Sequence, residues 1–390
     1  VFAIDATGSM KRFMLASAES VVQVAADIDN AYRGNEENKP LIRYSVVLYR
    51  DYQEENKKRS FLTARLPLTE SVEQVEGFLL EATEDVQGGG TGTRELELLR
   101  GDATIDAVDA ITLGGGSAFG LSAADGVMGW LVEQGRGFPV GDLHVPIVPG
   151  AILFDLLNGG EKSAFRNAPD TALPYRVLAR AATEHAGLDV ALGNGGAGFG
   201  ATTTGHDGRQ LKGGQGTASL VLDDGVTVGA LAAVNALGSV VANGAGQFLA
   251  GALERGHEFG GLGGAATIEV PDHPLDKYGL GTDVPNTTLA VVATDAVLTK
   301  AQANRVARMA QAGMARAIRP VFTPMDGDVV FALATGRVPI GDPARDVARI
   351  GMAAADCLSR AVARGVFAAQ GQGDWPAYTD IYRADPRNGR

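Results

Sequence analysis

The chain contains one cysteine and five histidines in 390 residues. The cysteine, Cys357, falls inside an expected helix, so neither a disulfide framework nor a cysteine-based metal site can be built. The histidines show no metal-ligand spacing and do not pair with a serine motif, which disfavours a Ser-His-Asp triad. A chain without disulfides fits a reducing compartment, and we expect a cytoplasmic protein.

Positive charge is also scarce. The chain has 34 lysines and arginines against 46 acidic residues, a net charge of -12, so neither nucleic acid nor an anionic membrane is expected as the main partner. The first residues lack the charged segment and apolar core of a signal peptide. One uncharged run, 225–253, is long enough to span a bilayer, but Asn235, Gln247 and many glycines within it favour buried core structure.

Glycine is distributed unevenly along the chain. Of 53 glycines, only Gly8, Gly34 and Gly77 precede Gly88. The length by itself favours two domains. We therefore predict a boundary near Gly88, with a first unit over residues 1–87 and a second over residues 88–390.

The first unit opens with an apolar stretch that ends at Asp5. An alternation of strand and helix predicts a parallel sheet with functional loops at its strand ends; the expected elements cover residues 1–4, 10–32, 42–49 and 71–81. Asp5, Thr7 and Ser9 offer a carboxylate and two hydroxyls, which are ligands suited to Mg²⁺. The alternative is an ordinary helix cap at Thr7 or Ser9. The segment resembles the start of a von Willebrand factor A-like domain, which implies a partial metal-binding module.

Two glycine-rich turns are candidates for ligand-binding loops. Gly115, Gly116 and Ser117 follow an apolar strand and precede a helical pattern, an arrangement that brings backbone N–H groups close to a ligand. Tight packing of a strand on a helix requires the same glycines. Residues 193–198 formally match Gly-x-Gly-x-x-Gly, but a glycine-rich loop follows instead of a helix, which excludes a dinucleotide site.

Residues 217–222 and 226–234 read as two strands joined by an Asp-Asp-Gly turn, which predicts a hairpin. Asn235 ends the second strand. Its amide either caps a turn there or donates a hydrogen bond to an oxyanion. Further along, the proline- and glycine-rich segment 271–285 is expected to form an exposed polar loop.

An abrupt change from loop to apolar run occurs at Asn286 and Thr287. Pro285 ends any helix, and the β-branched residues 287–294 predict a buried strand. Cleavage between Asn286 and Thr287 would leave a free amine beside the Thr287 hydroxyl, and such an amine can act as the base that activates the hydroxyl. Its unperturbed pKa of roughly 7.7 to 8.0 leaves a useful neutral fraction near pH 7. The bare tripeptide also reads as a turn before a strand.

Asp326 and Asp328 lie two residues apart, so on an extended segment both side chains point to one face. There they could hold the ammonium form of the Thr287 amine and fix its hydroxyl. The alternative is a plain Asp-Gly turn between strands.

Several of these motifs occur together in one family. From Gly88 to about Tyr382 the sequence resembles the L-aminopeptidase/D-esterase family, which includes the nylon-oligomer hydrolase. The motifs that carry the resemblance are Gly-Gly-Gly-Ser-Ala-Phe-Gly at 114–120, Val-Pro-Ile-Val-Pro at 145–149, Lys-Gly-Gly at 212–214, Val-Asn-Ala at 234–236, Asn-Thr-Thr at 286–288 and Met-Asp-Gly-Asp at 325–328.

The resemblance implies an α/β fold, a four-layer αββα sandwich, in a precursor that cleaves itself before a Ser or Thr. Carried over, Thr287 is the nucleophile, Asn235 supports the oxyanion, and Asp326 and Asp328 orient the Thr287 amine and hydroxyl. No cofactor is implied for hydrolysis, and a homo-oligomer of processed heterodimers is expected.

The sequence departs from the family pattern at three places. Phe154, in the predicted substrate loop, replaces a Tyr that hydrogen-bonds in the active site of some relatives. A Lys common around positions 205 and 206 is absent unless Lys212 substitutes for it. The family's first strands are missing before Gly88, where the von Willebrand-like segment stands instead.

The expected function is that of a self-processing hydrolase with an N-terminal threonine nucleophile, acting on small peptides or amides through an acyl-enzyme. One alternative is acyl transfer, because ornithine acetyltransferases share this architecture. The other is a non-enzymatic, Mg²⁺-dependent binding module built on Asp5, Thr7 and Ser9. Peptides, β-peptides, D-amino esters and nylon-type amides all fit as substrates.

Overall fold

The computed structural model describes residues 92–382 except 102, 161, 163–171, 185–189, 272–276 and 278–285, together with the backbone of short strands between residues 42 and 86. The proposed magnesium ligands Asp5, Thr7 and Ser9 lie outside these residues, as do the helices expected over 10–32 and most of 71–81.

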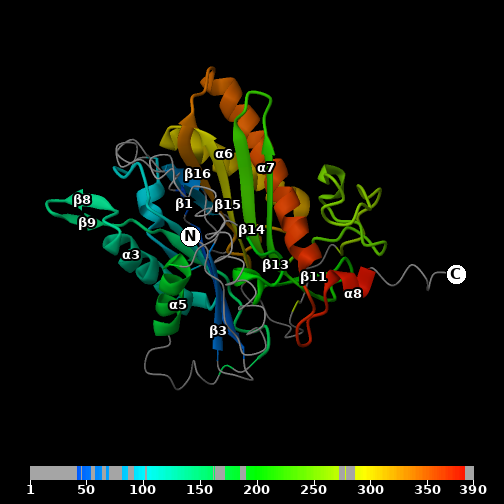
Figure 1. Cartoon of the computed structure of the whole chain (residues 1–390). Helices are drawn as coiled ribbons and strands as arrows, with labels where there is room; N and C mark the ends of the chain where they lie inside the picture. The colour runs from blue at the N-terminus through cyan, green and yellow to red at the C-terminus, as the bar shows by residue number, and fades with distance from the viewer. Residues whose placement is uncertain are drawn as a thin grey trace, which may run out of the picture.

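One five-stranded sheet has the order β13-β14-β15-β16-β5 (Figure 1). The predicted hairpin consists of β13 (Gly214–Val221) and β14 (Thr227–Asn235), and β15 (Thr287–Ala296) pairs antiparallel with β14. On its other side β15 runs parallel to β16 (Val329–Val338), which pairs antiparallel with β5 (Glu81–Val86). The β-branched and apolar run at 287–294 thus forms a central strand of this sheet.

The second five-stranded sheet has the order β3-β2-β7-β10-β6. Its strands are β3 (Lys58–Thr63), β2 (Val46–Gln53), β7 (Ile111–Gly114), β10 (Gly150–Ile152) and β6 (Thr93–Arg94). The strand expected over 42–49 falls on two strands, Ile42–Tyr44 and the start of β2, which belong to different sheets. In the middle of the sheet β7 is parallel to both of its neighbours.

The two sheets pack face to face. Alternate residues of β15 point to opposite sides: Leu289 and Val291 join a core between the sheets, whereas Ala290 and Val292 face a second core. Both faces of the strand are buried, which explains its continuous apolar sequence.

Helices cover the outer faces and complete four layers (Figure 1). On one side, α6 (Lys300–Ala317) and α7 (Pro343–Ala368) pack on the β13–β16 sheet; on the other, α3 (Ala123–Glu133) and α5 (Leu173–Glu184) pack on the β7 sheet. The short helix α8 (Tyr378–Tyr382) follows. The predicted αββα sandwich is confirmed.

Local capping signals set the starts of the two long helices. The Thr299 side chain accepts from the Gln302 backbone N–H, and the Gln302 side chain accepts from the Thr299 backbone N–H, which together form a capping box. The Asp342 side chain caps α7 before Pro343.

Shorter elements fill the connections. Three two-stranded pairs are β1 (Ile42–Tyr44) with β4 (Pro67–Thr69), β8 (Phe138–Val140) with β9 (Leu143–Val145), and β11 (Thr202–Thr204) with β12 (Gln210–Lys212). Single 3₁₀ turns occur at Leu96–Leu99, Ser117–Ser122, Gly196–Gly198 and Gly251–Leu253.

Strands from both sides of Gly88 share the two main sheets. β2 and β3 belong to the sheet that contains β7, and β5 forms an edge of the sheet that contains β15, so the expectation that the strands before Gly88 are missing is wrong. The division into 1–87 and 88–390 stays a prediction. Within the described residues, no helix is long and apolar enough to cross a membrane, and the uncharged run at 225–253 forms β14 and the buried loops after it.

Candidate active site

The bond between Asn286 and Thr287 lies at the buried start of β15. Thr287 is the register partner of Asn235, the last residue of β14. The side chains of all three residues are buried, with at most 1% of each residue exposed. The pairing of two antiparallel strands therefore places the predicted nucleophile directly beside the predicted oxyanion donor.

The carbonyl group of Asn286 is held by two donors. Its oxygen accepts from the Gly327 backbone N–H at 2.8 Å and from the Thr287 hydroxyl at 2.5 Å. The Asn286 N–H donates to the Met325 carbonyl at 2.7 Å. These backbone bonds form a parallel bridge between residue 286 and residue 326. Sequence reasoning missed Gly327, because it acts through its backbone rather than through a side chain.

The Asn235 amide ties three segments together. Its Oδ1 accepts from the backbone N–H and the hydroxyl of Thr202 at 3.0 and 3.1 Å, and its Nδ2 donates to the Phe154 carbonyl at 2.7 Å. An amide nitrogen carries two hydrogens, so a second donor position on Nδ2 is left after the bond to Phe154. Phe154 thus contributes to the site through its backbone carbonyl, although the resemblance to the family had drawn attention to its side chain.

Asp326 and Asp328 flank Thr287. Asp326 bridges to Asn286 and accepts from the Leu237 backbone N–H at 3.2 Å. Asp328 accepts from the Thr288 backbone N–H at 2.6 Å. The backbone bridge to Asn286 places Asp326 at the predicted cleavage point, and the Asp328 carboxylate bonds to Thr288, the residue after Thr287.

Burial makes both carboxylates hard to ionise. It raises the pKa of Asp326, against hydrogen bonds from Thr323 and Leu237 that lower it. Burial, followed by the adjacent Asp326, raises the pKa of Asp328 to about 8. The pair is therefore suited to exchange protons near neutral pH.

The loop predicted at residues 115–117 is connected to the end of β14 by Asp155, whose carboxylate is fully buried. The backbone N–H of Gly116 donates to Asp155 Oδ1 at 2.7 Å, and Asp155 directly follows Phe154. Gly116 and Ser117 adopt positive φ angles of 81° and 52°. A glycine such as Gly116 accepts such an angle without strain. The Gly116 N–H thus holds the loop in place, and sequence reasoning did not identify Asp155.

The chain lacks the lysine that the family often has around positions 205 and 206, but it has two buried lysines in this region of the fold, Lys212 and Lys277. Lys212 donates to the carbonyls of Gly198, Ala201 and Gly213 at 2.5 to 3.1 Å, which fastens the glycine-rich loop onto β12. Lys277 instead donates to Asn235 itself, to Oδ1 and to the backbone oxygen, each at 3.4 Å.

Lys277 overturns one expectation. It belongs to the segment 271–285 that was predicted to be exposed, yet only 1% of it is exposed. Carbonyl oxygens of Thr202 and Ala236, both at 3.2 Å, complete its hydrogen bonds and offset the loss of water. Burial lowers the pKa of Lys277 to about 7, while Asp326, Asp155 and Asp328 raise it.

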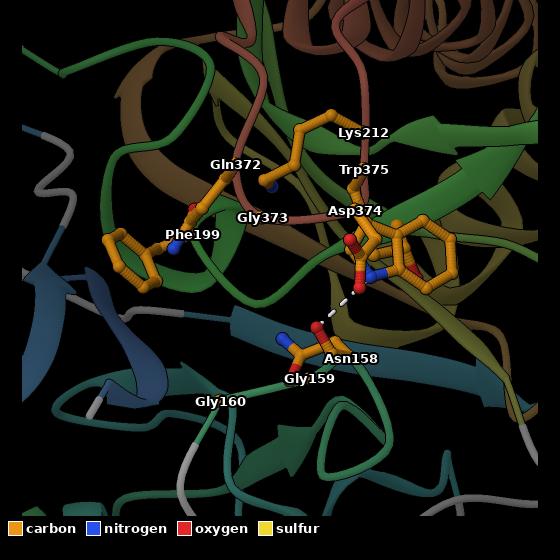
Figure 2. Close-up of a pocket in the computed structure, with 10 residues that line it drawn as sticks. Asn158, Gly159, Gly160, Phe199, Lys212, Gln372, Gly373, Asp374 and Trp375 are labelled. Atoms are coloured by element: carbon orange, nitrogen blue, oxygen red, sulfur yellow. Dashed lines mark hydrogen bonds between the residues drawn. The ribbon is translucent and has the colours of Figure 1, made fainter. Parts of the chain in front are cut away.

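A pocket opens beside Thr202, the residue that fixes the Asn235 amide. Figure 2 shows its lining, with Lys212, Phe199 and Gln372 on one side and Asn158 facing Trp375, whose indole N–H donates to the Asn158 carbonyl at 3.0 Å. The empty volume is about 480 Å³. The lining residues are Asn158, Gly159, Gly160, Phe199, Thr202, Lys212, Gln372, Gly373, Asp374 and Trp375.

Residues 64–374 match the model of peptidase family S58. The chain belongs to peptidase family S58. It is 44% identical over 317 residues to an uncharacterized aminopeptidase of Mycobacterium bovis, covering 76% of this chain and 85% of that one. It is 30% identical over 269 residues to a 6-aminohexanoate-oligomer endohydrolase of Agromyces sp., covering 66% of each.

Solved structures share the fold of this S58 peptidase. A β-aminopeptidase of Burkholderia sp. matches with a TM-score of 0.56 at 20% identity, covering 88% of this chain and 91% of that one. An L-aminopeptidase D-Ala-esterase/amidase of Ochrobactrum anthropi, described as a variant of the Ntn-hydrolase fold, matches with a TM-score of 0.52 at 21% identity, covering 86% and 85%.

Family membership makes the chain a hydrolase of peptide or amide bonds, and the predicted resemblance to the L-aminopeptidase/D-esterase family is confirmed. Peptidases of this type generally need no cofactor. Among the described residues, no cluster of three His, Cys, Asp or Glu could hold a metal ion. The resemblance to a von Willebrand factor A-like domain stays a prediction.

Proposed function

We propose that the chain is a precursor that cleaves its own bond between Asn286 and Thr287, and that the freed Thr287 is the nucleophile for peptide and amide substrates. One observation carries this proposal: the Thr287 hydroxyl and the Gly327 N–H converge on the carbonyl oxygen of Asn286. A hydroxyl beside a carbonyl whose oxygen already accepts an N–H is the arrangement that an acyl shift requires.

In the first step, Thr287 Oγ1 attacks the Asn286 carbonyl carbon. Negative charge develops on the carbonyl oxygen, where the Gly327 N–H at 2.8 Å stabilises it. The C–N bond then breaks, the hydroxyl proton passes to the departing Thr287 amine, and an ester joins the two residues. Water hydrolyses the ester, which leaves a carboxylate on Asn286 and restores the Thr287 hydroxyl.

The mature reaction repeats these steps on an external amide. The free Thr287 amine takes the hydroxyl proton as the oxygen attacks. The leaving amine of the substrate receives that proton, and water then releases the acyl group. Asn235 Nδ2 supplies a second oxyanion donor, and Asp326 and Asp328 hold the ammonium form of Thr287 from its two sides.

We infer that the substrate is a small peptide or amide that enters by the pocket at Thr202 and Trp375. The pocket shares Thr202 with the Asn235 amide, so a molecule bound there lies close to Asn235, the register partner of Thr287. Its mixed lining of an indole, a phenyl ring and amide groups suits a short amide chain. A cytoplasmic homo-oligomer of processed heterodimers remains our expectation.

Intact mass spectrometry of the purified chain tests the proposal. We expect two fragments, residues 1–286 and 287–390, and one uncut chain in Thr287→Ala. Thr294→Ala is the matched control, because Thr294 lies on the same strand, is also buried and hydrogen-bonds to Thr227 rather than to the cleavage point. A wild-type chain that stays whole after prolonged incubation would exclude this mechanism.

Hydrolysis and acyl transfer are separated by their products. Cleaved protein is incubated with an amide substrate, with and without an added amino acid. Free acid in both reactions supports hydrolysis, whereas an acylated amino acid in the second indicates transfer.

A further inference from the structure

The structure holds three buried lysines, Lys212, Lys277 and Lys300, with 2%, 1% and 7% of each exposed. Each ammonium donates to backbone carbonyls. Lys300 donates to Leu98 at 2.9 Å and to Ile105 at 2.6 Å, and so fastens the start of α6 to the loop before β7. Lys212 and Lys300 therefore act as clamps between segments: Lys212 donates to Gly198, Ala201 and Gly213, and Lys300 donates to the loop before β7.

Lys277 differs because its acceptors belong to the reaction centre. Two of them are atoms of Asn235, and a third is the carbonyl of Ala236, the next residue. On Asn235 the ammonium approaches Oδ1, the end of the amide opposite Nδ2. A cation on the amide oxygen draws electron density from the nitrogen, which makes its N–H groups stronger donors.

The charges around Lys277 also distinguish it. Burial lowers its pKa to about 7, and three carboxylates oppose this change: Asp326 and Asp328 on one segment and Asp155 on another. In return Lys277 lowers the pKa of Asp326. One buried cation thus acts on three buried carboxylates, and removing it would make Asp326 harder to ionise.

We propose that Lys277 is a positioning residue for both self-cleavage and amide hydrolysis: its ammonium fixes Asn235 as an oxyanion donor and keeps positive charge beside the developing oxyanion. This inference rests on the proposed function. Because Lys277 precedes the cleavage point, the fragment 1–286 has to remain bound to the fragment 287–390 for full activity.

The test compares Lys277→Met with Lys300→Met. Both remove a buried ammonium from backbone carbonyls, so both lose stability, but only the first touches Asn235. Freshly translated chains are followed for appearance of the 287–390 fragment. We expect Lys277→Met to cleave about ten- to a hundredfold more slowly, the size of a lost hydrogen bond to a charged group, and Lys300→Met to cleave at the wild-type rate once folded.

The pH profile of cleavage separates positioning from folding. Cleavage rates are measured from about pH 5.5 to about pH 9.5, with circular dichroism to confirm folding. If the charged ammonium is required, the wild-type rate falls as pH rises above the Lys277 pKa of about 7, and Lys277→Met lacks this fall. Lys277→Arg keeps its charge at every pH used, so the fall should be absent from this pH range.

Two outcomes overturn the inference in different ways. A wild-type chain that cleaves, with Lys277→Met equally fast and with the same pH profile, contradicts the role of Lys277 alone. A wild-type chain that does not cleave removes the proposed function and the role of Lys277 with it. If Lys277→Met does not fold, the pH profile of cleavage in Lys277→Arg shows whether the rate depends on the charge at residue 277.

Discussion

The paired strands β14 and β15 have the same backbone pairing at both ends, but very different surroundings. At one end, Asn235 and Thr287 meet among buried polar groups, with no more than 1% of either exposed. At the other end, the exposed Thr227 donates its N–H to Asp295 at 2.7 Å, and Thr294 donates to the Thr227 carbonyl. The first end is buried inside the protein, and the second end lies beside the hairpin turn.

This difference shows how burial turns ordinary polar residues into a reactive site. At the turn, Thr294 and Asp295 form local hydrogen bonds to the exposed residue Thr227. At the buried end, Asn235, Lys277 and the two aspartates must satisfy one another, which fixes their geometry and shifts their pKa values. The following predictions test whether chemistry is confined to the buried end.

The largest effect is expected at Asn235. Removing its amide in Asn235→Ala deletes one oxyanion donor, which typically costs about a hundredfold to a thousandfold in rate. Self-cleavage of freshly translated chains is the measurement. Asp295→Ala, at the far end of the same strand pair, is expected to cleave at the wild-type rate. Equal slowing in both variants would mean that the rate reports stability of the strand pair rather than the oxyanion site.

Much of the fold follows from the sequence by local rules. The hairpin of β13 and β14 is predicted by its Asp-Asp-Gly turn, and α6 by the capping box at Thr299. The proximity of Asn235 and Thr287 can also be predicted from the sequence, because Asn235 ends one apolar strand and Thr287 begins another. The roles of these residues stay predictions, but their proximity is a finding of the structure.

The remaining contributors to the site could not be read from the sequence. Lys277 is a single lysine in a proline- and glycine-rich segment, where composition predicts exposure; its burial depends on carbonyls from two distant strands. Gly327 acts through a backbone N–H, and its position depends on a parallel bridge to Asn286. The Asp155 carboxylate accepts from Gly116, which lies 39 residues earlier in the sequence. Each depends on contacts between distant segments, which no local pattern records.

A second, intermediate effect concerns pH and stability. Asp328 has a pKa raised from 3.8 to about 8 by burial and by Asp326, so the folded chain keeps a proton that the unfolded chain releases. Its contribution to stability is therefore full below about pH 3.8 and is lost as pH rises through about 8. In Asp328→Asn this titration is absent, so the free energy of unfolding should change less between these pH values.

Urea unfolding at several pH values measures this effect. The uncut Thr287→Ala background keeps the chain in one piece, so that both variants unfold as a single species. Asp295→Asn in the same background is the control from the far end of the strands and should keep the original pH dependence. An unchanged slope in Asp328→Asn would show that the carboxylate is ionised in the folded chain.

The smallest effect is expected at Thr294. Thr294→Val keeps the shape of the side chain but removes its hydrogen bonds to the Thr227 carbonyl and from the Ala296 N–H. Thr227 is exposed, so water replaces part of what is lost, and the free energy of unfolding should fall by only about 1 kcal/mol. Cleavage should proceed at the wild-type rate, since nothing at the turn touches Asn235 or Thr287. A clear slowing of cleavage in Thr294→Val would show that strain at one end of β15 reaches the other, and the two ends would then have to be treated as one site.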